Sequence, residues 1–409
     1  MVIKKAKKKY SSPDWTSLPT DLVHLILEKL ILLEDYIRFS AVCKRWFSVG
    51  QDQKLHRLKT NIFNQPPMLV IPQGRTSPVT RSLYNVMERK TYVGSRFEYD
   101  NFFVGSSFGW LATVSENLAI DLINPFSGKT IELPPISKVV PDPNPNVFLH
   151  NAHDLIMQSY SLNPEIWRRS RVVKVILSDN PCLNPDNYIV AAIVYGFYTM
   201  AFIRPGKDDS WTYLNQEILF LDDILFYKGK LYAVDYKDRL IKINDLDKDS
   251  SAPNVEILIP KCDYEFIKGS CLAESVDGEL LHVKRIHWDK LCEGRIYTKQ
   301  FQVFKLGKVK DGGKEERVGW VEIESLGSQA LFLGMNHSVS ILVNDDLSPY
   351  IQQNSIYYMD CNLDRGEYRF DDVGIYNLKD QSVGPYHNPL YDGIDKHFLP
   401  SIWISPTLQ

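Results

Sequence analysis

The spacing of apolar residues changes abruptly near residue 66, and this change constrains the fold of the 409-residue chain more than any other feature. Before it, Leu22, Ile26 and Leu30 recur every four residues, with Val23 and Leu27 beside them; this is the period of an amphipathic helix. After it, short runs rich in Val, Ile, Tyr and Phe alternate with Pro and Gly, which is typical of strands. The chain is therefore predicted to be multidomain, with a small all-α part of three short helices followed by a large all-β part.

The β-rich part shows signs of a repeated unit. Three apolar runs separated by two short turns fill residues 218–244, as in three strands of a propeller blade. The pattern Gly-x-Leu-x-x-Val begins at Gly109, Gly229 and Gly278, and its last two copies lie 49 residues apart. Because propeller blades repeat every ~40–50 residues, residues 66–409 predict a β-propeller of about seven blades. Other predicted strands are Trp110–Val114, Leu118–Ile123, Leu280–Lys284, Phe301–Leu306, Ile356–Asp360 and Gly374–Leu378.

Charge is divided unevenly along the chain. The formal net charge is −3, whereas residues 1–60 contain nine Lys and three Arg against four Asp and two Glu. The total gives no indication of a nucleic-acid partner. Residues 1–13 are predicted to be a basic disordered tail. Its lysines form a candidate nuclear-import signal, the alternative being a solvated tail without a specific role: Lys4, Lys5, Lys7, Lys8 and Lys9.

Targeting and membrane signals are weak. The six cysteines are scattered without a Cys-x-x-Cys pair, which we interpret as reduced thiols, and the Lys-rich start lacks the apolar region of a signal peptide. The apolar stretch Tyr188–Ile203 is shorter than the ~20 residues that a membrane span needs. Two buried strands joined near Gly196 explain it better. We expect no membrane association and a location in the nucleus, the cytoplasm or both.

One pentapeptide resembles a catalytic motif. Residues 105–109 read Gly-x-Ser-x-Gly, the nucleophile elbow of α/β-hydrolases, with Ser107 as the nucleophile. That elbow requires a helix after it, but Trp110–Val114 is predicted to be a strand, and the alternation of strands and helices of that fold is missing. The glycines fit a turn between strands. We expect no catalytic activity and keep a serine hydrolase as a remote alternative.

Metal and phosphate sites are also not expected. Residues 127–130 contain the end of a phosphate-binding loop without its earlier Gly, so they are predicted to form a β-turn. His150 and His153 lack a third ligand at a suitable spacing, and His282 and His287 are interpreted as structural. The sequence therefore predicts no metal and no cofactor.

The helical part has a distinctive start, middle and close: Trp15, Leu18-Pro19, Asp21-Leu22, Ile26, Leu30 and Val42-Cys43-Lys44-Arg45-Trp46. The resemblance is to the F-box, a three-helix module of cullin-type ubiquitin ligases. It implies an F-box over residues 14–55 and a linker over 56–65. It also implies a Skp-type adaptor as partner, through which the chain would reach a cullin and a RING subunit.

The physical chemistry of the segment leads to the same expectation. Roughly 40 residues cannot build a self-sufficient core, and this segment carries more large apolar side chains than three short helices can hide. We expect seven residues on the adaptor-binding face: Leu18, Pro19, Leu22, Ile26, Leu30, Val42 and Trp46. The alternative is that they pack against the second domain of the same chain.

Several segments of the β-rich part follow one another in a distinctive order: Val104–Ala112, Asn124–Gly128, Ala201–Gly206, Gly229–Val234, Phe301–Leu306, Ala330–Gly334 and Ile356–Tyr358. In these segments the β-rich part resembles the KIB-type domain of plant F-box proteins, which is described as a β-propeller. The resemblance implies a module that binds a target protein, without naming the target.

Together the two resemblances imply the substrate-recognition subunit of an SCF-type (Skp–cullin–F-box) ubiquitin ligase. Such a subunit has no catalysis of its own and recruits an unidentified target protein for ubiquitination. The alternative from a different class is an F-box-containing interaction or regulatory scaffold that acts outside the ligase.

Overall fold

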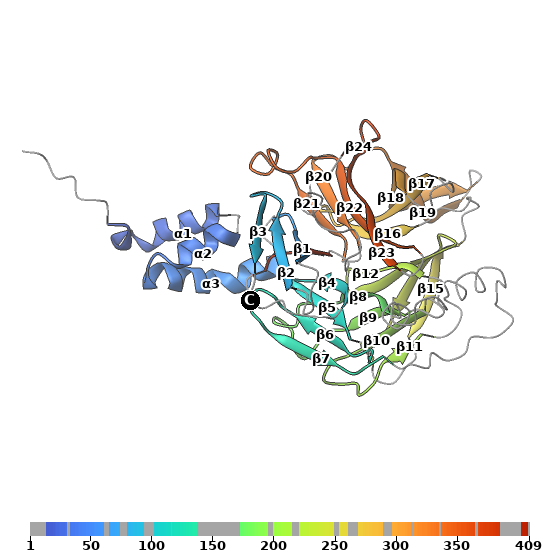
Figure 1. Ribbon diagram of the computed structural model, residues 1–409, viewed down its shortest axis with the longest axis horizontal. Coiled ribbons are helices and arrows are strands. Elements are labelled where there is room, and N and C mark those ends of the chain that lie inside the picture. The colour runs from blue at the N-terminus through green and yellow to red at the C-terminus, as the bar shows by residue number, and fades with distance from the viewer. Residues whose placement is uncertain are drawn as a thin grey trace, which may run out of the picture. The chain divides into compact units, whose positions relative to one another are not determined.

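The chain divides into two compact units, Met1–Gln65 and Pro66–Thr407, which are described separately. The structure is a computed structural model (Figure 1). It describes residues 14–30, 33–60, 65–73, 80–93, 102–115, 117–136, 172–194, 199–214, 221–248, 253–260, 269–288, 297–311, 315–334, 337–364, 367–384 and 402–407. No helix within these ranges is long and apolar enough to cross a membrane.

The first unit is helical, as predicted. Its elements are the 3₁₀ turn η1 (Trp15–Ser17) and the helices α1 (Thr20–Lys29), α2 (Leu33–Ser40) and α3 (Lys44–Thr60). Asp14 caps the first turn, because its side chain accepts a hydrogen bond from the backbone N–H of Thr16. The linker expected over 56–65 is not observed as such, since α3 continues to Thr60.

The helical unit has a small core of its own. Six buried side chains form it, two from each helix: Val23, Leu27, Tyr36, Phe39, Trp46 and Val49. The rings of Phe39 and Trp46 lie 4.6 Å apart between centroids. The hydroxyl of Tyr36 donates to the carbonyl of Gly50 at 2.5 Å, which ties α2 to α3.

The second unit consists of six β-sheets in the described part of the chain. In spatial order, the first sheet is β25 (Ile402–Ile404), β1 (Met68–Gln73), β2 (Thr80–Asn85) and β3 (Lys90–Val93). The second is β4 (Phe102–Ser107), β5 (Trp110–Val114), β6 (Ile120–Ile123) and β7 (Thr130–Leu133). The third is β8 (Val172–Leu177), β9 (Val190–Val194), β10 (Thr199–Ile203) and β11 (Thr212–Tyr213).

The remaining sheets follow in chain order. The fourth is β12 (Leu221–Tyr227), β13 (Lys230–Asp235), β14 (Leu240–Asn244) and β15 (Asn254–Ile259). The fifth is β16 (Ser270–Glu274), β17 (Leu280–Trp288), β18 (Tyr297–Asp311) and β19 (Glu315–Ile323). The sixth is β21 (Val339–Leu342), β20 (Gln329–Leu333), β22 (Ser355–Asp364), β23 (Glu367–Asn377) and β24 (Ser382–Gly384).

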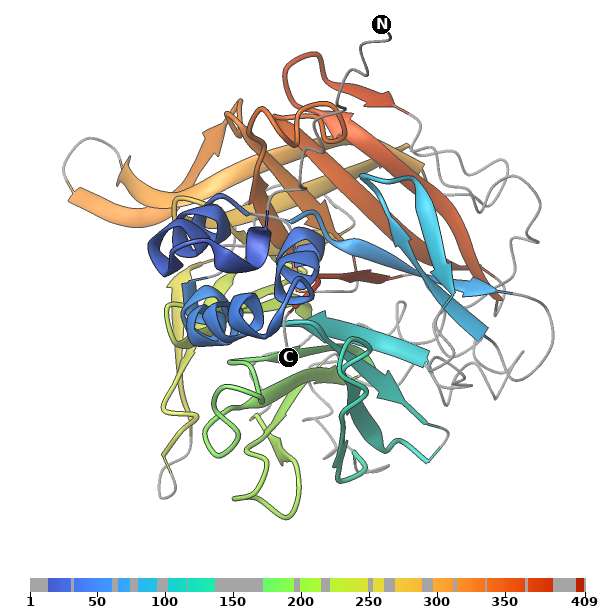
Figure 2. The same ribbon diagram turned by 90° about the vertical axis from the view of Figure 1, so that its left-hand side faces the viewer.

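These sheets form a six-bladed β-propeller. In Figure 2 they radiate from a shared centre, where the dark red strand β25 lies. The strands β25, β4, β8, β12, β16 and β21 contact one another in that order and form the inner side. Because β25 pairs with β1, the C-terminal segment supplies the inner strand of the first blade, which closes the ring.

The expected number of about seven blades is wrong. The inner strands β8, β12 and β16 begin 49 residues apart, but β4 and β8 begin 70 residues apart. Dividing the length of the domain by a uniform blade period therefore counts one blade too many.

The repeat found in the sequence marks equivalent positions. Gly109, Gly229 and Gly278 each end the turn between the inner strand of a blade and the next strand. All three have φ between 70° and 77°, a left-handed conformation that favours glycine. The repeat therefore records one turn type in the second, fourth and fifth blades.

The sixth blade departs from a simple meander. Its strands β20 and β21 form an antiparallel pair, and the chain then returns so that β22 pairs in parallel with β20. The inner strand of this blade is therefore the second in sequence.

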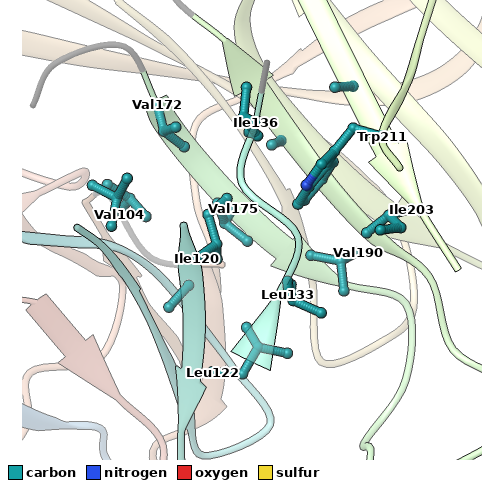
Figure 3. Close-up of a cluster of buried hydrophobic side chains, with 14 of the residues drawn as sticks. Val104, Ile120, Leu122, Leu133, Ile136, Val172, Val175, Val190, Ile203 and Trp211 are labelled. Atoms are coloured by element: carbon teal, nitrogen blue, oxygen red, sulfur yellow. The ribbon is translucent and has the colours of Figure 1, made fainter. Parts of the chain in front are cut away.

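The blades pack face to face through apolar side chains. Figure 3 shows the cluster between the second and third blades, in which Ile120 and Leu122 of β6 face Val175 and Val190 of the next blade. The indole N–H of Trp211 donates to the carbonyl of Pro134 at 2.7 Å and ties the same two blades together.

Candidate functional site on the helical unit

The helical unit presents large apolar side chains to solvent. Six of them keep 45% to 56% of their surface exposed: Trp15, Leu22, Leu25, Ile37, Val42 and Phe47. Soluble proteins rarely expose this many large apolar side chains in one short segment. Where they do, the exposed side chains mark an interaction site. We call these six residues the apolar surface of the helical unit.

The apolar residues of helix α1 are divided between a buried face and an exposed face. Val23 and Leu27 lie four residues apart and are buried in the core. Leu22 and Leu25 lie three residues apart and remain exposed, and Ile26 lies between the two faces, half-buried. At 3.6 residues per turn, α1 therefore packs one side inward and presents the other.

The seven residues predicted for the adaptor-binding face are placed differently from one another. Pro19, Leu22 and Val42 are exposed. Leu18, Ile26 and Leu30 are half-buried and pack against the core.

The prediction for Trp46 is corrected by the structure. Its side chain is 7% exposed and belongs to the core. Its indole N–H donates to the carbonyl of Trp15 at 3.2 Å. Trp46 therefore supports the apolar surface from inside, because it holds the segment that carries the exposed Trp15.

A second contact fixes the same segment. The guanidinium of Arg45 donates to the hydroxyl of Thr20 at 2.6 Å, which ties the start of α3 to the start of α1. With the Trp46–Trp15 hydrogen bond, this contact anchors the N-terminal turn at two points. The apolar surface is thus presented on a preorganised set of helices.

Sequence reasoning missed four residues of the apolar surface: Trp15, Leu25, Ile37 and Phe47. Leu25 had a usable signal, since it follows Leu22 by three residues and so shares its helix face. Phe47 adjoins the buried Trp46, and neighbouring residues on a helix point to different sides. The spacing of apolar residues alone does not show which of Trp46 and Phe47 is buried.

The structure also places the residues of the alternative chemistries. Ser107 ends β4 and is followed by a turn and by β5, so the helix of a nucleophile elbow is replaced by a strand. Its hydroxyl oxygen accepts a hydrogen bond from the backbone N–H of Leu177. Residues 127–130 lie at the turn between β6 and β7, where Gly128 has φ of 74°, as predicted.

The buried histidine of β17 is structural. His282 is fully buried, with Trp320 at a centroid distance of 4.9 Å. Burial lowers the pKa of His282 to about 3 and outweighs the Asp238 carboxylate, which acts in the opposite direction, so the imidazole is neutral at neutral pH. Among the described residues, no group of three or more His, Cys, Asp or Glu could hold a metal ion. His150, His153 and the five lysines of the basic tail lie outside the described residues.

Comparison with known families decides what the two units are. The family model described as the KIB1-4 β-propeller matches residues 83–377, and the model described as F-box-like matches residues 15–59. The chain belongs to the KIB1-4 β-propeller family. The F-box-like match covers the apolar surface of the helical unit, and the propeller match covers most of the six blades.

Relatives of this KIB1-4 propeller protein share its whole length. The F-box protein SKIP23 of Arabidopsis thaliana is 22% identical, over 96% of this chain and 95% of the relative. The probable F-box protein At4g22165 of Arabidopsis thaliana is 24% identical, over 98% of this chain and 99% of the relative. Among solved structures, the β-propeller domain of Myceliophthora thermophila Cps50 (Swd1) is 10% identical with a TM-score of 0.34, over 77% of this chain and 81% of that one.

These matches support the coarse outline drawn from the sequence. The chain combines an F-box with a KIB-type β-propeller, as plant F-box proteins do. The two matching models are described by their folds, as a β-propeller and as F-box-like.

Proposed function

We propose that this protein is the substrate-recognition subunit of an SCF-type ubiquitin ligase. The helical unit binds a Skp-type adaptor and thereby a cullin–RING ligase, and the propeller holds a target protein. Catalysis belongs to other subunits. The contribution of this chain is proximity, since tethering raises the effective concentration of target lysines near the ubiquitin donor.

The apolar surface of the helical unit is the observation that carries this proposal. Burial of a fully exposed side chain of this kind contributes roughly 1.5–3 kcal/mol. The six side chains on the unit that matches the F-box are about half exposed, so about half of that gain remains for each of them. Association costs roughly 4–15 kcal/mol, so most of the gross gain is needed to form the complex. Loss of two side chains should therefore abolish stable binding.

The experiment is co-purification of adaptor and cullin with the full-length chain. Leu22→Ala combined with Leu25→Ala removes two exposed groups of α1 while leaving the buried Val23 and Leu27 intact. We expect adaptor and cullin to be lost from this variant. The matched control is Val318→Ala, an exposed valine on β19 of the propeller, which should retain both.

Two results would contradict the proposal in different ways. Adaptor binding that survives the double substitution would show that the apolar surface is not required for binding the adaptor. Adaptor binding without cullin would instead favour the scaffold that acts outside the ligase. A ubiquitination assay with a target found by proximity labelling completes the test.

A further inference from the structure

A groove of about 600 Å³ lies between the fifth and sixth blades of the propeller. Its floor is apolar and buried, formed by Phe301, Val303, Tyr376 and Leu378. The rings of Phe301 and Tyr376 meet with a centroid distance of 5.4 Å. This volume lies within the range of ~300–1,000 Å³ that is typical of ligand sites.

The two blades that line the groove are joined by a hydrogen bond between β18 and β23. The strand β19 pairs with β18 only from Val303 onward, which leaves the preceding part of β18 without a strand on that side. There the backbone N–H of Thr298 donates to the carboxylate of Asp372 on β23 at 2.6 Å. This edge of β18 is thus held against the sixth blade, which supplies Tyr376 and Leu378 to the groove.

The rim of the groove carries an excess of negative charge. Glu322 and Glu324 line one wall, and Lys379 is the one cation among the described residues of the lining. Glu322 accepts a hydrogen bond from the side-chain amide of Gln302 at 3.3 Å. Within the described ranges, neither glutamate forms an ion pair, so the described lining carries two acidic residues against one lysine.

The other rim groups suit an extended polypeptide. Gln300, Gln302 and Gln381 line the groove, and a side-chain amide both donates and accepts hydrogen bonds. An extended peptide likewise offers one N–H donor and one C=O acceptor for each residue. A rim of amides can therefore pair with a peptide backbone whatever its side chains are.

We propose that the groove binds an extended segment of the target protein and that Glu322 and Glu324 select a Lys or Arg side chain of that segment. The peptide backbone lies along the amides of the rim, and the cationic side chain lies between the two glutamates. This assignment rests on the proposed function, because it identifies the place at which the propeller holds its target.

The experiment uses the full-length chain, and adaptor binding is measured separately. The chain selects binders from a display library of short random linear peptides, and the best peptide and its Lys/Arg→Gln form are then measured by fluorescence anisotropy. We expect enrichment of Lys or Arg at one position. Glu322→Gln with Glu324→Gln should weaken binding of the selected peptide about tenfold, as the loss of two partly exposed charge pairs predicts.

The matched control is Glu316→Gln. Glu316 is an exposed glutamate on the same strand, where it pairs with Lys308 away from the groove lining, and its replacement should leave peptide affinity unchanged. Glu322→Lys with Glu324→Lys should turn the selection toward acidic peptides. A library without preference for basic residues, or equal affinity in the Glu322/Glu324 and Glu316 variants, would overturn the proposal.

Adaptor binding is measured on the same preparations. Peptide selection that persists while every variant fails to bind adaptor would refute the ligase function and leave the groove intact. Adaptor binding without peptide selection would refute the groove alone.

Discussion

The ammonium group of Lys284 lies 2.6 Å from Oδ2 of Asp238, and this buried ion pair joins the fifth blade to the fourth. The other carboxylate oxygen of Asp238 accepts a hydrogen bond from the hydroxyl of Ser270 at 3.1 Å. The seam between the two blades thus contains charges that are largely shielded from water, since the side chains of Lys284 and Asp238 are 5% and 13% exposed.

Removing one member of this pair should cost far more than removing both. Lys284→Met leaves the buried Asp238 carboxylate without its cation, and we expect a loss of about 3–5 kcal/mol in the free energy of unfolding. Combining it with Asp238→Asn should restore part of the loss, since asparagine is neutral and tolerates the left-handed φ of 58° at this position. Urea unfolding followed by tryptophan fluorescence measures both.

The control for that prediction is a surface pair. Lys308 and Glu316 lie 3.0 Å apart and are both well exposed, so Lys308→Met should change the free energy of unfolding by less than ~1 kcal/mol. An equal loss in Lys284→Met and Lys308→Met would show that the buried pair has no special role.

Asp222 predicts a pH dependence of stability. Burial, followed by the charges of Asp238, Asp223 and Asp235, raises the pKa of Asp222 from 3.8 to about 7. Because the folded chain then holds this proton more tightly than the unfolded chain, stability falls as pH rises from about 4 to about 7. The free energy of unfolding of Asp222→Asn should therefore rise by about 2 kcal/mol relative to that of wild type as the pH increases from 5 to 8. Urea unfolding measures both proteins. A difference in the free energy of unfolding that stays the same at every pH from 5 to 8 would contradict this prediction.

Trp46 should contribute mainly to the stability of the helical unit, and only indirectly to adaptor binding. Trp46→Ala empties the centre of the helical core, beside Phe39, and should lower the free energy of unfolding by about 3–5 kcal/mol. The Leu22/Leu25 double alanine variant should leave stability nearly unchanged, because both side chains are half exposed or more. Helical circular dichroism during thermal unfolding separates the two; similar melting curves would place Trp46 outside the core.

Two glycines of the repeat offer a matched comparison. Gly109 and Gly229 have φ of 77° and 70°, so alanine at either should cost roughly 1–2 kcal/mol from backbone strain. A Cβ at Gly109 would lie 2.2 Å from Oγ1 of Thr407, whereas nothing lies within 4 Å of one at Gly229. Gly109→Ala should therefore be clearly the less stable variant in thermal unfolding, with partial rescue by Thr407→Ala. Equal melting temperatures would contradict this contact.

The basic run of the first 13 residues predicts a distribution in the cell. We expect a fluorescent fusion of the full chain to enter the nucleus, because clustered lysines are read as an import signal. Replacing them with glutamine should shift the fusion toward the cytoplasm: Lys4, Lys5, Lys7, Lys8 and Lys9. An unchanged nuclear fraction would leave the run as a solvated tail.

The pattern of apolar residues was sufficient to predict much of the propeller. The strand predicted at Trp110–Val114 is observed with those bounds. The two strands predicted around Gly196 are β9 and β10, paired antiparallel. Local patterns succeed here because strands of a meander pair with sequence neighbours, so that pairing and turn chemistry lie close together in the chain.

Features that depend on distant residues were not predictable in the same way. The closure of the first blade by β25 joins Leu69 to Trp403, and no local pattern links two such positions. The same limit applies to Trp46, whose burial depends on Phe39 of another helix. Side chains of similar character on neighbouring positions are sorted into core and surface by tertiary packing.

The closing strand has a consequence for synthesis and for faulty gene products. Since β25, the inner strand of the first blade, follows every other described strand in the chain, the helices can form during synthesis long before the ring can close. A premature stop codon just ahead of Ile402 would release a product with an intact helical unit and an open propeller. Under the proposed function, such a product would occupy the ligase without recruiting a target, and it would inhibit the wild-type protein rather than simply lack function.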